Sequence, residues 1–100
     1  MPVAHHALWA DHLRRGEIEE AYQEALRYRD GAFFWRGLMR ACCLGHLGRL
    51  DEARAEVAGL VRPKPDFARR GRILIGRLLK LPELQARVAE GLAKAGLALD

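Results

Sequence analysis

Apolar residues recur along the whole chain at the three- and four-residue spacing of α-helices, and no segment alternates like a β-strand. Six segments follow this pattern, and the breaks between them contain glycine or proline. The predicted helices cover about residues 3–15, 17–29, 32–47, 51–61, 67–80 and 82–95. Because the connections are short, we expect an all-α fold of three stacked antiparallel helical hairpins.

A six-residue motif at 16–21 returns at 48–53, an offset of 32 residues. Each copy has a turn glycine, a polar residue, an aliphatic residue, two acids and an alanine. Glycine can end one helix in the left-handed conformation, and acids in the next first turn face its positive dipole end. An offset close to ~34 residues is typical of helix–turn–helix repeats, which bind partners rather than perform chemistry.

The second copy resembles a tetratricopeptide repeat. Ala41 stands at the small position of the first helix, Leu44 at its large position, Ala53 at the alanine of the second helix and Pro65 at the closing proline. The resemblance implies a right-handed α-solenoid within one domain, 1–100. Its first repeat would cover about 3–30, its second about 32–65, and a terminal helix pair about 66–96. The last two helices do not match the repeat.

A narrower resemblance covers about two thirds of the chain and is carried by the stretch from 34–36 through 45–55, followed by 65–67 and 91–97. These segments are similar to the C-terminal repeat region of bacterial adenylate-cyclase-like and TolB-like regulatory proteins. This resemblance implies that the module is normally the tail of a longer signalling protein.

Several kinds of chemistry have no support in the sequence, which contains no serine, threonine or asparagine. Serine and threonine nucleophiles and N-glycosylation are therefore excluded within this segment. Cys42 and Cys43 diverge by about 100° on a helix, so we expect buried fillers rather than a disulfide. The spacing of Cys42 and His46 leaves a thiolate–imidazole dyad open. The histidines lack the spacing of a zinc site, so we predict no enzyme activity, no metal and no cofactor.

Positive charge gathers in one predicted helix, while the whole chain has a net charge of +4. Residues 67–81 contain no acid and five basic residues: Arg69, Arg70, Arg72, Arg77 and Lys80. This face is either simply solvated or binds an acidic peptide; no groove-reading pattern accompanies it, which disfavours nucleic acid. No apolar run reaches the ~20 residues of a membrane span, and no signal peptide is visible, so we expect a cytoplasmic protein.

The leading functional hypothesis is a protein–protein interaction module that binds a peptide or helical segment in a concave groove. The repeat resemblance places Trp35, Leu38, Cys42 and His46 on that groove face. Arg69, Arg72 and Arg77 would fix acidic groups of the partner. The alternative is a homodimerisation module, because fewer than three full repeats bury little surface.

Overall fold

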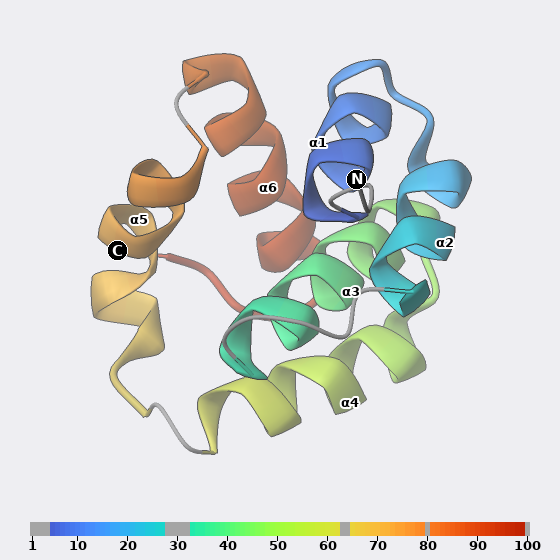
Figure 1. Ribbon diagram of the computed structural model, residues 1–100. Coiled ribbons are helices and arrows are strands. Elements are labelled where there is room, and N and C mark those ends of the chain that lie inside the picture. The colour runs from blue at the N-terminus through green and yellow to red at the C-terminus, as the bar shows by residue number, and fades with distance from the viewer. Residues whose placement is uncertain (1–4, 28–32, 63–64, 80, 100) are drawn as a thin grey trace.

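The structure, a computed structural model, describes residues 5–27, 33–62, 65–79 and 81–99, apart from the side chains of 5–7, 33–35, 74, 77 and 78. Its helices, in chain order, are α1 (His5–Arg14), α2 (Ile18–Arg27), α3 (Phe33–Leu47), α4 (Leu50–Val61), α5 (Phe67–Leu78) and α6 (Pro82–Lys94). The described ranges contain no strand. The predicted all-α class is therefore confirmed (Figure 1).

Glycines in the left-handed conformation end three of these helices. Gly16, Gly48 and Gly96 have φ values of 81°, 76° and 101°. At Gly48 the backbone N–H donates to the carbonyl three residues back (3.2 Å), and the N–H of Arg49 donates to the Leu44 carbonyl (3.0 Å). The same pair of bonds recurs at the other two glycines. These bonds satisfy carbonyls that a helix end would otherwise leave unpaired, as the repeated motif predicts.

The two copies of the motif also begin their second helices alike. Ala21 and Ala53 are both fully buried, and each N–H donates to the carbonyl four residues back at 3.0 Å. In the first two hairpins α1 packs closely on α2 and α3 packs closely on α4. The two hairpins contact each other where α2 packs on α3. Arg49, in the turn before α4, places its guanidinium 5.1 Å from the Tyr22 ring of α2. The first two hairpins therefore pack side by side.

The third helix pair is arranged differently from the first two. Its second helix, α6, packs closely on α3 and also contacts α1, whereas α5 packs only lightly on other helices and, among the described residues, mainly on α6. Figure 1 shows α6 between α5 and α1, over α3. One face of α1 and α3 is therefore covered by a segment of the same chain.

Two glycines permit this close crossing of α3 and α6. A Cβ atom on Gly45 would overlap the Gly91 carbonyl oxygen, and one on Gly91 would lie 2.5 Å from the Cys42 carbonyl oxygen. Large side chains of the three helices α1, α3 and α6 are fully buried: Trp9, Leu13, Leu38, Met39, Leu44, Val88 and Leu92. α1, α3 and α6 therefore supply most of the large core side chains, and Leu60 of α4 and Phe67 and Ile75 of α5 add to them.

Candidate functional site

Two of the predicted groove residues are buried and do not line an open groove. Leu38 and Cys42 are 0% exposed, because α6 packs on the side of α3 that carries them. The side chain of Trp35 lies outside the described residues. The structure thus corrects the sequence prediction for Leu38 and Cys42, which pack in the core where a partner cannot reach them.

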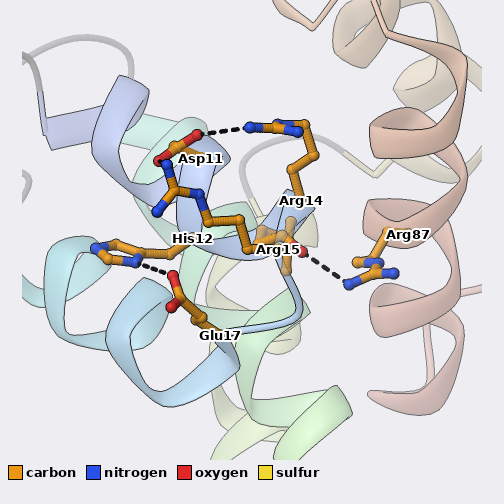
Figure 2. Close-up of polar contacts among 7 residues, drawn as sticks. Asp11, His12, Arg14, Arg15, Glu17 and Arg87 are labelled. Carbon is orange, nitrogen blue, oxygen red and sulfur yellow. Dashed lines mark hydrogen bonds and ion pairs between the residues drawn. The ribbon is translucent and has the colours of Figure 1, made fainter.

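His46, the fourth predicted groove residue, binds α6 instead. Its Nε2 lies 2.7 Å from the backbone carbonyl oxygen of Arg87, so this nitrogen carries the proton and donates. The Arg87 side chain in turn donates through Nη1 to the Leu13 carbonyl oxygen at the end of α1 (2.9 Å). One residue of α6 is therefore bonded to both α1 and α3, and Figure 2 shows Arg87 reaching toward α1.

Charged side chains gather around the turn between α1 and α2, near Arg87 (Figure 2). Asp11 pairs with Arg14 at 3.0 Å and with Arg15 at 3.2 Å, and His12 pairs with Glu17 at 2.8 Å. The partners are close in sequence and partly exposed, so each pair contributes little to stability. These contacts explain the cluster as a local structural feature of the turn.

The adjacent cysteines are both buried and free. The indole Nε1 of Trp9 donates to the Cys43 sulfur at 3.2 Å. Burial, and secondarily the hydrogen bond with Cys43, raises the pKa of the Cys42 thiol well above its ordinary value. A neutral thiol is a weak nucleophile, and the His46 nitrogen that donates to Arg87 has no lone pair with which to act as a base.

Basic side chains occupy the outer face of α5, which lies at the edge of the molecule in Figure 1. Arg69, Arg70 and Arg72 are exposed, and Ile73 among them is 60% exposed. With about 100° between successive residues, Ile73 points between Arg69 and Arg70, and Arg72 borders the same face. We call these four residues the α5 surface. The side chain of Arg77, the third predicted contact, lies outside the described residues.

The opposite face of α5 is anchored in the core. Phe67 is 1% exposed, and a Cβ on Gly71 would lie 2.7 Å from a methyl carbon of Leu99, in the segment after α6. Past the end of α5, the Gln85 amide of α6 donates to the Leu79 carbonyl oxygen (2.6 Å). The α5 surface is therefore presented by a helix that α6 and the following segment hold from behind.

A second feature, a pocket, lies between α3 and α4 and was missed in the sequence. It has a volume of about 90 Å³ and is lined by Arg36, Gly37, Arg40, Glu56, Gly59 and Leu60. The available signal was the pair Arg36 and Arg40, four residues apart in an otherwise apolar helix. Among the described side chains, no group of three histidine, cysteine or acidic residues converges as a metal site would require.

Comparison with known proteins finds no matching family model, no matching curated protein and no matching solved structure. Within the described ranges, no helix is long and apolar enough to cross a membrane.

Proposed function

We propose that this chain is a protein-binding module whose α5 surface docks an acidic, partly apolar segment of a partner protein. The observation that carries the proposal is the 60% exposure of Ile73 among three exposed arginines. An apolar anchor surrounded by guanidinium groups suits a helix or extended segment with carboxylates beside a buried side chain. Arginine is also well suited to interfaces because its planar fork binds a carboxylate through two hydrogen bonds.

The scaffold behind this surface belongs to the same proposal. The first two hairpins are proposed to be tetratricopeptide-type repeats, supported by the matching glycine turns and the buried Ala21 and Ala53. In that family the first helices of the repeats line the ligand groove. Here α6 covers that face, and the partner is therefore proposed to bind α5 instead. The resemblance to cytoplasmic bacterial regulatory proteins makes such a protein the proposed parent.

A defined probe tests the α5 surface directly. The probe is a fluorescent amphipathic peptide with leucine on one face and glutamate on the other, and its anisotropy reports binding. The double variant Arg69→Glu/Arg72→Glu should weaken binding by about tenfold or more, which corresponds to ~1.4 kcal/mol. It should also reduce the salt dependence of binding. The helical circular dichroism should be unchanged, because surface charges contribute little to stability.

A matched control reverses two charges elsewhere on the surface. Arg54 and Arg62 are also exposed, so Arg54→Glu/Arg62→Glu changes the net charge equally without touching α5. Equal binding by the two double variants would mean that the basic face of α5 is only solvated and does not bind the peptide. The homodimer alternative is tested by sedimentation across a dilution series. If the mass halves on dilution and Ile73→Asp abolishes the dimer, the α5 surface binds a second copy of this chain.

A further inference from the structure

The pocket between α3 and α4 is small and has two arginines among the residues that line it. Arg36 and Arg40 come from successive turns of α3, and Glu56 and Gly59 line the opposite side from α4. At about 90 Å³, the pocket is well below the ~300 Å³ of a typical small-molecule site. Its size suits the end group of a larger segment rather than a whole ligand.

Arg36 supplies the observation that points to a ligand. Its Nε is buried and has no hydrogen-bond acceptor among the described residues. Buried donors in folded proteins are nearly always paired, and an unpaired charged donor is costly. An anion bound by Arg36 would balance the charge of the guanidinium that carries this donor.

Arg40 is held in place beside Arg36. Its Nε and Nη2 lie 3.4 Å from the carbonyl oxygens of Ala25 and Leu26 at the end of α2. A guanidinium has five N–H donors, so these two long bonds leave three donors for a ligand. The bonds to α2 therefore position the group while most of its donors remain available.

We infer that this pocket binds a carboxylate group of a partner polypeptide. A planar carboxylate matches the fork of donors that an arginine offers. Glu56 places one negative charge in the lining, which repels a dianionic phosphate more strongly than a monoanionic carboxylate. The inference uses residues on α3 and α4, so it and the proposed function of the α5 surface can fail separately.

Gly59 offers a way to close the pocket without disturbing the fold. A Cβ on Gly59 would meet no atom within 4 Å, and the residue lies inside α4, where most side chains favour the helix more than glycine does. Gly59→Met should therefore fill the pocket while the protein stays folded. Ala55→Met is the matched control, because Ala55 is exposed on the same helix and does not line the pocket.

The test follows the ¹⁵N-resolved Nε–H signals of the arginines by NMR near neutral pH and at constant ionic strength. The probes are N-acetylglycine for a chain terminus, N-acetylglutamate amide for an acidic side chain, neutral N-acetylglycinamide, and inorganic phosphate. We expect saturable, millimolar shifts of Arg36 with at least one carboxylate probe and none with the neutral amide. Gly59→Met should weaken that binding by about tenfold or more, and Ala55→Met should leave it unchanged.

The remaining outcomes decide the inference as well. Tighter binding of N-acetylglycine would indicate a chain terminus as the ligand, and tighter binding of N-acetylglutamate amide would indicate an acidic side chain. Equal binding of the two would mean that the pocket recognises the carboxylate group alone. Tighter binding of phosphate would overturn the carboxylate assignment. Shifts that do not saturate, that are as large at Arg54, or that persist in Gly59→Met would overturn the site altogether.

Discussion

Two glycines show how one missing side chain determines helix packing. Each glycine inside a helix lowers its stability by roughly 0.5–1 kcal/mol relative to alanine. At Gly45 and Gly91 this cost accompanies a crossing so close that either Cβ would collide with the backbone of the other helix. The gain is the burial of Cys42 and Leu92, both 0% exposed, against the facing helices.

Gly45→Ala should therefore destabilise the protein despite its higher helix propensity. We expect a loss of about 1–3 kcal/mol from overpacking, measured as a lower urea midpoint. Gly59→Ala is the control, because its Cβ would meet no atom within 4 Å and should stabilise by about 0.5–1 kcal/mol. Equal stability of Gly45→Ala and the unchanged protein would mean that α6 does not cross α3 at this point.

The buried thiol of Cys42 makes stability depend on pH in the alkaline range. Its pKa is raised above the ordinary value of 9.0 by burial and by Cys43, so above pH 9 the folded state holds a proton that the unfolded state loses. The contribution to stability is full below the ordinary pKa and falls as the pH rises toward the folded pKa. Thermal melts between neutral pH and about pH 10 should show the decline.

Cys42→Ala separates this thiol from other alkaline groups. Burial also raises the pKa of Tyr22, whose contribution declines in the same direction at higher pH. The variant is less stable overall because it leaves a cavity, but its melting temperature should fall less between the two pH values. An identical decline in both proteins would assign the effect to Tyr22 or another group.

At the scale of single elements, the spacing of apolar residues predicted most of the structure. Each helix begins and ends within about two residues of the predicted limits where those limits are described, because glycine and proline act locally. The end of α3 at Gly48 is the clearest case, since its φ of 76° is the conformation that the motif requires. Leu50, an apolar motif position, is nevertheless 41% exposed.

Ala53 tests the contact between the two helices of the second hairpin. Its methyl group is fully buried where α3 and α4 pack together. Ala53→Leu should overpack this contact and cost about 1–3 kcal/mol, read as a lower melting temperature. Ala55→Leu adds the same atoms at an exposed position and should change stability by less than about 0.5 kcal/mol. Equal melting temperatures would contradict the assigned repeat register.

At the scale of the whole molecule, local patterns could not place α6. Exposure of Arg69 and Arg72 followed from the helical period, because the apolar stripe of α5 had to face inward. Whether α5 or α6 would cover α1 and α3 depends on contacts between distant residues, such as Gly45 with Gly91 and His46 with Arg87. The α3–α4 pocket was equally hidden, since its lining is assembled from two helices.

The central position of α6 leads to the last prediction. A chain ending at Leu79 should lose cooperative unfolding and bind the dye ANS, as expanded states with exposed apolar surface do. Removing α6 would uncover Leu38 and Cys42 and leave α5 without its helix partner, and the proposed repeats number fewer than the three that stacked repeats need for stability.

Leu92→Ala in the full chain is the milder control. Leu92 is fully buried on α6, so its truncation should cost about 2–5 kcal/mol while unfolding stays cooperative. A shortened chain that melts cooperatively within a few degrees of the full chain would show that α6 is a docked segment, not an obligatory part of the core. The face of α1 and α3 would then be available to partners, and the groove predicted around Leu38, Cys42 and His46 would become the site to examine.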